Sequence, residues 1–261
     1  MELVKLEEVS AGYEGKVILN SVNLTINSGD FIGIIGPNGG GKTTLLKVLL
    51  GIIKPYNGNV IYCNESDNLF GYLPQNQQID KKFPITVTEV VLSGLMHRKS
   101  IFSRYTKAEK ELVHQLLEQY GLSEYKNSAI GDLSGGQIQR VMLCRAIISN
   151  PKILILDEPT TYIDANFEKE FYSLLNKLNQ TMTIVMVSHD IGTICSYVKS
   201  IACVNRGLHY HNSNIITNEQ LQSYNCPIEL VSHGNIPHRV LHNHNAEHTH
   251  NCGCDTHNHK Q

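Results

Sequence analysis

The sequence predicts an α/β fold with a mostly parallel sheet, into which a block of helices is inserted. The first observation is an alternation along the chain, in which short apolar runs bounded by turn residues alternate with segments of helical periodicity. The second is that residues 86–149 carry only helical patterns. With 41% hydrophobic and 18% charged residues, the 261 residues can bury the core of one large domain, or of one domain with a small insertion.

The N-terminal part is predicted to hold four short strands and one helix. Apolar runs that end in Gly, Asn, Ser or Pro are typical of strands, and they cover residues 16–26, 29–36, 58–63 and 69–74. Between the second and third runs, the segment KTTLLKVLLG has four leucines at helical spacing, and Gly51 is a natural helix end.

Helices dominate the middle of the chain, and the alternation then resumes. The helices are expected at residues 86–98, 106–121 and 134–149. Strands follow at residues 151–157, 182–188 and 200–205, and helices at 166–178 and 191–198. We therefore divide the chain into a domain of residues 1–226, with the helical part at about 86–149 inserted, and a His- and Cys-rich tail of residues 227–261. That tail is expected to be disordered without a ligand.

Charge and hydropathy argue against several classes of protein. The net charge is −2 with His neutral, which gives no electrostatic reason to expect nucleic acid as a partner. The apolar runs are far shorter than the roughly 20 residues of a membrane-spanning helix, and the first residues lack signal-peptide character. We therefore expect a cytosolic protein whose link to a membrane runs through another protein. Scattered cysteines are expected to be buried free thiols, namely Cys63, Cys144, Cys195, Cys203 and Cys226.

Residues 36–44, GPNGGGKTT, fit the pattern G-x-x-x-x-G-K-T between an apolar strand and a helix, the context that a phosphate-binding loop requires. The glycines let successive backbone N–H groups face phosphate oxygens, and the helix adds the positive end of its dipole. Lys42 would reach the β- and γ-phosphates, and the Thr43 hydroxyl would bind Mg²⁺. The predicted loop consists of Gly36, Pro37, Asn38, Gly39, Gly40, Gly41, Lys42, Thr43 and Thr44.

The segment ILILDEP places two carboxylates at the end of a buried strand. Asp157 can hold Mg²⁺ through its water shell, and Glu158 follows it. A carboxylate beside the γ-phosphate can orient and deprotonate an attacking water molecule. An acidic pair at a strand end is usually only solvated, but together with the glycine loop it predicts a site that hydrolyses a nucleotide.

The segment LSGGQ, residues 133–137, opens a second helix with a Ser and two glycines. That helix continues through Ile138, Val141 and Met142, so its N-terminus is a second potential anion site. One nucleotide cannot easily use both sites of one subunit. Two copies arranged head-to-tail could each cover the nucleotide of the other.

With these motifs in the expected order and at the expected intervals, residues 1–210 or so resemble the ATP-binding cassette (ABC) family. The resemblance implies a P-loop NTPase core of RecA-like type, with an antiparallel β edge and an inserted helical subdomain. It also implies that the chain binds ATP and Mg²⁺ and is an ATPase, with Glu158 as the catalytic base.

The resemblance further implies roles for residues outside these motifs. Tyr13 would stack on adenine, Gln75 would sense Mg²⁺ and connect to the membrane partner, and His189 would contact the γ-phosphate. Asp164 would contact the opposite subunit. The family usually has a small or flexible residue at the position of Tyr162, so this residue bears on the contact between subunits. The residues that would cover the partner's nucleotide are Ser134, Gly135, Gly136 and Gln137.

A lone cassette without membrane helices resembles the ATPase subunit of an assembled importer. We expect a homodimer at the cytoplasmic face of the membrane, bound to permease subunits that work with an extracytoplasmic metal-binding protein. Residues 203–213 and 94–111 resemble segments of ATPases from zinc and manganese importers, so zinc import is the leading prediction. Manganese or chelated iron remains open as cargo, and so does a metal-responsive regulator without a transport partner.

The tail ends in HNHNAEHTHNCGCDTHNHK, in which ligands recur at i and i+2. In an extended segment such side chains project to one side, close enough to share a metal. Imidazole and thiolate suit Zn²⁺, and suit Mn²⁺ less well. The alternative is a solvated His-rich end that binds metals incidentally. The candidate Zn²⁺ ligands are His242, His244, His248, His250, Cys252, Cys254, His257 and His259.

Overall fold

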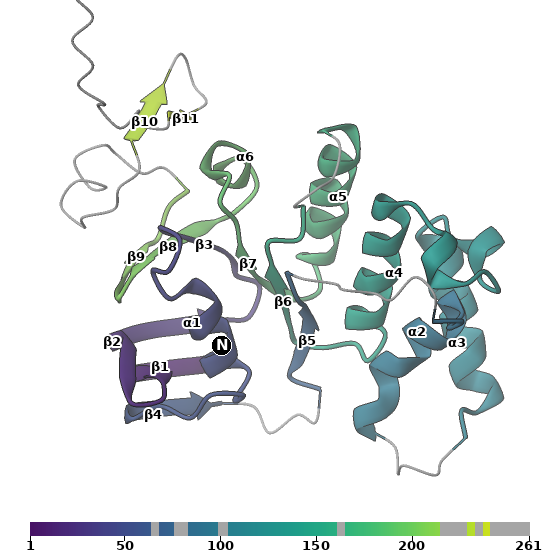
Figure 1. Ribbon diagram of the computed structural model, residues 1–261, viewed down its shortest axis with the longest axis horizontal. Helices are drawn as coiled ribbons and strands as arrows, with labels where there is room; N and C mark the ends of the chain where they lie inside the picture. Colours follow the sequence, from purple (N-terminus) through teal and green to yellow (C-terminus); the bar gives the residue numbers. More distant parts are fainter. Residues whose placement is uncertain are drawn as a thin grey trace, which may run out of the picture.

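The computed structural model describes residues 1–63, 68–75, 83–98, 104–160, 165–214, 229–232 and 237–240 (Figure 1). Its strands are β1 (Glu2–Tyr13), β2 (Lys16–Asn27), β3 (Phe31–Ile35), β4 (Asn57–Tyr62), β5 (Phe70–Leu73), β6 (Ile153–Asp157), β7 (Thr183–Val187), β8 (Ser200–Asn205), β9 (Gly207–His211), β10 (Glu229–Ser232) and β11 (Pro237–Val240). Its helices are α1 (Lys42–Leu49), α2 (Val87–Leu92), α3 (Lys107–Gln119), α4 (Gly135–Ile147), α5 (Ala165–Leu178) and α6 (Ile191–Cys195), with 3₁₀ turns η1 (Ser93–Arg98), η2 (Ser123–Tyr125) and η3 (Ile130–Asp132).

The central sheet has six strands in the order β5-β6-β7-β3-β8-β9, and all of its pairings are parallel except β8–β9. Every residue of β3, β6 and β7 is buried, which is typical of parallel strands that are covered on both faces. Alternate residues of β6 serve two cores, since Ile153 and Ile155 pack on one face and Leu154 and Leu156 on the other.

A separate antiparallel sheet, β2-β1-β4, packs with α1 against one face of the central sheet. The other face is covered by α5 and α6, and the helices between β5 and β6 extend from that side (Figure 1). Three helices of this block begin with a Ser or Thr capping box, in which the cap side chain and a Glu or Gln three residues later satisfy each other's backbone N–H groups. The caps are Thr86, Thr106 and Ser134.

The α/β fold with a mostly parallel sheet, an antiparallel edge and an inserted helical block is therefore confirmed. Several details differ from the sequence-based expectation. Residues 93–98 form a 3₁₀ turn, and at Gly94 a Cβ would lie 2.1 Å from the carbonyl oxygen of Arg145, so the backbones meet too closely for a side chain. Helix α6 ends at Cys195, and the edge strand β9 had no predicted counterpart. The boundary at residue 226 lies outside the described residues and stays a prediction.

The cysteine prediction is wrong at one position. Cys144, Cys195 and Cys203 are buried free thiols, but Cys63 is exposed. Cys63 follows β4, an edge strand whose residues are exposed or half-buried. The apolar run at residues 58–63, which suggested burial, is therefore largely exposed to solvent. Cys226 lies outside the described residues.

Neighbouring parallel strands end at the same edge of the central sheet. In the paired registers, Ile34 of β3 and Asp157 of β6 both lie opposite Val187 of β7. The loops that follow these strands therefore begin side by side, which is where ligands bind in open α/β sheets.

Candidate active site

The glycine loop leaves the central strand β3 and enters α1 through backbone conformations that require glycine. Gly36 has φ 151°, and a Cβ there would lie 2.0 Å from the carbonyl oxygen of Val204. Gly41, the N-cap of α1, has φ 105°, and a Cβ would lie 2.7 Å from a methyl carbon of Leu19. The loop is thus fitted closely against β2 and β8, with its backbone N–H groups available at the start of α1.

Lys42 is folded back over this loop. Its Nζ donates to the carbonyl oxygens of Gly36 and Pro37, each at 3.0 Å, and its side chain is buried. The ammonium group is therefore held at the centre of the loop, where it adds a positive charge to the dipole of α1.

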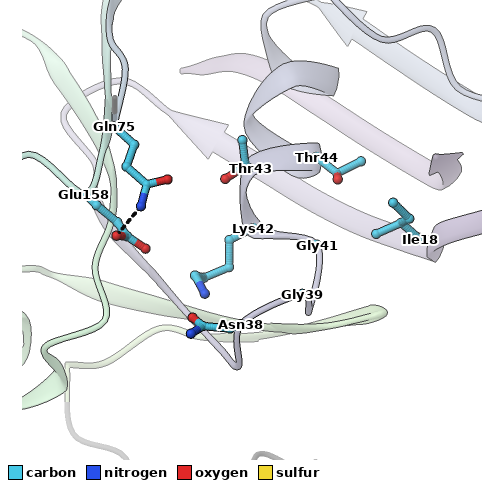
Figure 2. A pocket seen from close by; sticks show the side chains of 9 residues that line it. All are labelled: Ile18, Asn38, Gly39, Gly41, Lys42, Thr43, Thr44, Gln75 and Glu158. Carbon is cyan, nitrogen blue, oxygen red and sulfur yellow. Dashed lines mark hydrogen bonds between the residues drawn. The ribbon is translucent and has the colours of Figure 1, made fainter. Parts of the chain in front are cut away.

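A cavity of about 260 Å³ opens beside the loop (Figure 2). It brings together loop residues from the start of α1 and two predicted residues from distant parts of the chain, Gln75 after β5 and Glu158 after β6. Its lining consists of Ile18, Asn38, Gly39, Gly41, Lys42, Thr43, Thr44, Gln75 and Glu158.

Glu158 is held at the border of this cavity by contacts from two neighbouring loops. Its backbone has φ 48°, a left-handed conformation that is uncommon for a residue with a side chain, and its N–H donates to Val187 at 3.0 Å. Its Oε2 accepts a hydrogen bond from Gln75 Nε2 at 2.6 Å and lies 3.5 Å from His189 Nδ1. The three residues that we predicted to be catalytic therefore lie together.

Asp157 is the last residue of β6, directly before Glu158; it does not line the cavity and is only 2% exposed. Burial raises the pKa of its carboxyl group, and the charge of Glu158 adds to this, while a hydrogen bond from Thr43 and the charges of Lys42 and Lys47 oppose it. Its Oδ1 is buried and meets no hydrogen-bond donor among the residues that the structure describes. A buried carboxylate oxygen near a hydroxyl group is a donor set that fits Mg²⁺.

The signature segment, which we define as residues 134–137, forms the start of α4. Ser134 Oγ accepts from the Gln137 N–H at 3.3 Å, and the Ser134 N–H donates to Gln137 Oε1 at 2.8 Å. Gly135 and Gly136 form the first turn. None of these residues lines the cavity beside Lys42, so within the described part of one chain the two helix N-termini form separate sites.

Other predicted residues are not brought to the cavity. Tyr13 is 41% exposed at the end of β1, and Lys47 Nζ lies 5.5 Å from the centre of its ring. Its role in stacking on adenine stays a prediction. Asp164, Tyr162 and the tail ligands from His242 to His259 lie outside the described residues. In the described ranges, no group of three or more His, Cys, Asp or Glu residues could hold a metal ion.

Sequence reasoning missed two supports of the site. Ile18 lines the cavity from β2, and the Arg206 N–H donates to the Gly40 carbonyl oxygen at 3.0 Å. The alternating pattern of residues 16–26 could have placed Ile18 on one face of a strand. Nothing in the sequence pairs the turn at Arg206 with the glycine loop, because they meet only through sheet topology. No helix within the described residues has the length and apolar character needed to cross a bilayer.

Comparison with known proteins agrees with this geometry. The model of the ABC transporter family matches residues 19–161, more than half of the chain. The chain belongs to the ABC transporter family. The "Probable metal transport system ATP-binding protein" of Thermotoga maritima is 38% identical to it, over 93% of this chain and 98% of that protein.

Two further ABC proteins extend the comparison. The "High-affinity zinc uptake system ATP-binding protein ZnuC" of Bacillus subtilis is 37% identical, over 79% of this chain and 93% of that protein. A solved dimeric structure of a bacterial ABC transporter cassette is 27% identical and superimposes with a TM-score of 0.69, covering 82% of this chain and all of that one.

Proposed function

We propose that this chain is the ATP-hydrolysing subunit of an ABC transporter that imports zinc ions. The observation that carries the ATPase part is the position of Glu158, which lies at the border of the loop cavity between Gln75 and His189. Membership of the ABC transporter family supports the same conclusion. The zinc part draws on relatives that are named as zinc uptake proteins.

Four groups of the proposed reaction already border one cavity, namely Lys42, Thr43, Gln75 and Glu158. Backbone N–H groups of the glycine loop and the Lys42 ammonium bind the phosphates of ATP, and Glu158 accepts a proton from the water that attacks the γ-phosphorus. Gln75 and His189 orient the Glu158 carboxylate, and His189 also contacts the γ-phosphate. Thr43, Gln75 and Asp157 would hold Mg²⁺, which supplies positive charge beside the phosphate oxygens when it is bound.

The proposed working unit is a homodimer. Residues 134–137 lie apart from the cavity of their own chain, so they are available to cover a nucleotide held by a second copy. Asp164 would contribute to the same contact. A related cassette has been solved as a dimer, which supports this arrangement.

A groove between the central sheet and the helical block supports docking on a permease. Its volume is about 300 Å³, and it runs from the end of β5 to η1 and α4. Arg145, whose Nε donates to Ser93 Oγ at 3.1 Å, provides a positive charge there. We propose that permease subunits contact this region at the cytoplasmic face of the membrane, and that an extracytoplasmic metal-binding protein delivers the cargo.

The test is metal accumulation in cells that carry Glu158→Gln in place of the unaltered chain, with zinc, manganese and iron measured together. We expect ATP binding to persist, hydrolysis to slow by about 10²–10⁴, and zinc accumulation to fall selectively. Glu118→Gln, which neutralises an exposed carboxylate of α3, is the matched control. Unchanged ATP turnover would remove Glu158 from the role of base.

Manganese or chelated iron is the second candidate cargo. The relative from Thermotoga maritima is named for metal transport without a specified metal, and we expect the residues that select the cargo to lie in the permease and the metal-binding protein. A selective fall in manganese or iron in the same experiment would favour this candidate over zinc. It would leave the ATPase assignment unchanged.

We further propose that the His and Cys residues of the tail bind cytosolic zinc and either buffer it or reduce transport when zinc is plentiful. Only the residue types and their spacing support this idea. The test removes residues 233–261 and measures the zinc content of the purified protein and the zinc dependence of transport. The proposal fails if neither quantity changes.

A further inference from the structure

The first turn of α4 packs against one aromatic side chain of α5. A Cβ at Gly136 would lie 2.8 Å from two ring carbons of Phe167, so the backbone of the signature segment rests directly on that ring. One helical turn later, the Arg140 guanidinium lies over the same ring, with Cζ 5.0 Å from the ring centre. Residues i and i+4 of α4 thus enclose Phe167, and the cation adds an attraction to the ring face.

Two contacts made by residues of α5 support this arrangement. Arg140 Nη2 forms an ion pair with Glu170 Oε2, which lies three residues after Phe167 on the same helix. The ring of Phe167 stacks on that of Phe171, with centres 6.1 Å apart and planes inclined by 25°. Because Phe171 is fully buried, a continuous path of contacts runs from the signature segment through Phe167 into the core under the central sheet.

The surface beside this path is hollowed. An open hollow of about 360 Å³ lies between the end of α3, Arg140 and the outer face of α5. Arg140 and Glu170 both line it, so their ion pair lies at the edge of this hollow. At this point Phe167 and the Arg140–Glu170 pair join the signature helix to α5. Figure 1 shows α4 and α5 side by side at this junction between the helical block and the sheet.

We propose that Phe167 is a positioning residue for ATP hydrolysis, which sets the angle at which residues 134–137 close on the nucleotide of a second copy. The inference rests on the homodimer of the proposed function. Phe167 is in the first turn of α5, directly after the segment of Asp164. Phe167 contacts the signature segment directly, and it follows within three residues in sequence the other residue that is expected to face the partner.

The variant Phe167→Leu keeps an apolar side chain but removes the flat ring and its cation contact. In the assembled transporter we expect kcat to fall about 10- to 100-fold, as for other small displacements of catalytic groups, with KM for ATP nearly unchanged. Phe167→Tyr keeps the ring and should restore kcat. Lys169→Ala, an exposed position on α5, is the control. A loss that Phe167→Tyr does not restore, or a loss confined to KM, would overturn the proposal.

A second measurement separates positioning from folding. Glu158→Gln is expected to retain ATP and so to accumulate as an ATP-bound dimer, which sedimentation can quantify. Adding Phe167→Leu should weaken this dimer at least about tenfold while the ATP affinity of the monomer stays the same. If Phe167→Leu fails to fold, Glu170→Gln is the substitute, because its side chain is largely exposed, and a smaller weakening in the same direction is expected.

The outcomes distinguish the inference from the proposed function. Glu158→Gln that binds ATP but never dimerises would contradict the homodimer itself. A dimer that forms equally well with and without Phe167→Leu would overturn only the role of Phe167. Parallel losses of monomer ATP affinity and dimer formation would mean that Phe167 only stabilises the fold, and would overturn the proposal as well.

Discussion

Two helices of this chain begin at glycine-rich segments, and their N-termini are built differently. The N-cap of α1 is Gly41, and no side chain of the described residues caps the helix. The N-cap of α4 is Ser134, which forms a complete capping box with Gln137. The first-turn N–H groups of α1 thus lack a side-chain cap and can bind a ligand, whereas in α4 the side chains of Ser134 and Gln137 provide the cap. This difference agrees with our proposal that α1 binds the phosphates and that α4 meets a nucleotide only through a second copy.

Burial adds to the contrast. At the start of α1, Lys42 and Thr44 are buried and the loop is enclosed by neighbouring strands. At the start of α4, Ser134 and Gly135 are exposed. A preformed, enclosed site binds without further ordering, and an exposed helix end with satisfied caps is stable until a partner covers it. Burial thus supports our proposal that α1 and its loop bind the phosphates and that α4 acts in the assembled dimer.

Removing the positive charge at α1 should have the largest effect. We expect Lys42→Ala to weaken ATP binding by the isolated subunit about 100-fold, since charge-assisted hydrogen bonds to phosphate contribute about 3 kcal/mol. Equilibrium titration with a fluorescent ATP analogue measures this. Lys16→Ala, which removes an exposed lysine from the neighbouring strand β2, should leave affinity unchanged. If Lys42→Ala kept its affinity for ATP, the proposed difference in phosphate binding between the N-termini of α1 and α4 would be contradicted.

Changes at the cap of α4 should have a smaller effect that appears only in the assembled protein. Ser134→Ala removes the cap and should destabilise the fold by about 1 kcal/mol, while the ATP affinity of the monomer stays the same. Ser134→Asn restores a capping side chain, so thermal unfolding should return toward the wild-type value. ATPase activity of the transporter should remain low in both variants if the hydroxyl also contacts the partner's nucleotide. Full activity of Ser134→Asn would limit Ser134 to capping.

The two ends also differ in how far the sequence predicts them. The loop at residues 36–44 was predicted with its strand and helix, because each glycine, Lys42 and Thr43 lie within one local pattern. Glu158 was linked to the loop as a carboxylate at the end of a buried strand, and Gln75 only through the family resemblance. The 2.6 Å contact between them depends on which strands are neighbours. The packing of Phe167 on Gly136 had no signal in the sequence, since a Phe at helical spacing looks like any core residue.

Topology explains most of what the sequence did not reveal. Strand β9 adds to the sheet edge through an antiparallel pairing, and the turn before it, at Arg206, braces the loop at Gly40. The β8–β9 pairing is a local hairpin, whereas the contact between Arg206 and Gly40 joins segments that are far apart in the chain. Local propensity indicates elements and their ends, whereas contacts between elements follow from strand order, which one sequence does not contain.

The smallest predicted effect concerns the stability of the preformed site. Because the pKa of Asp157 is raised by burial and by Glu158, the folded chain holds this proton more tightly than the unfolded chain does. Without ligand, the contribution of Asp157 to the free energy of unfolding therefore falls as pH rises from the ordinary carboxyl pKa through the raised one. Above that range, the full cost of burying the charged carboxylate remains. Asp157→Asn cannot ionise and should raise the melting temperature at neutral pH by about 2–4 °C.

The pH dependence and the ligand response distinguish this effect from general stabilisation. The difference in melting temperature between Asp157→Asn and the unaltered chain should shrink as pH is lowered through the same range, because the wild-type carboxyl group becomes neutral too. With ATP and Mg²⁺ the order should reverse, since ligand binding stabilises only the chain that retains the carboxylate. Asp132→Asn, at an exposed position in η3, controls for the loss of one negative charge. If Asp157→Asn were less stable than the unaltered chain at neutral pH, the interactions of the carboxylate with Thr43 and Lys42 would outweigh the cost of burying it. The N-terminus of α1 would then be stable without its ligand.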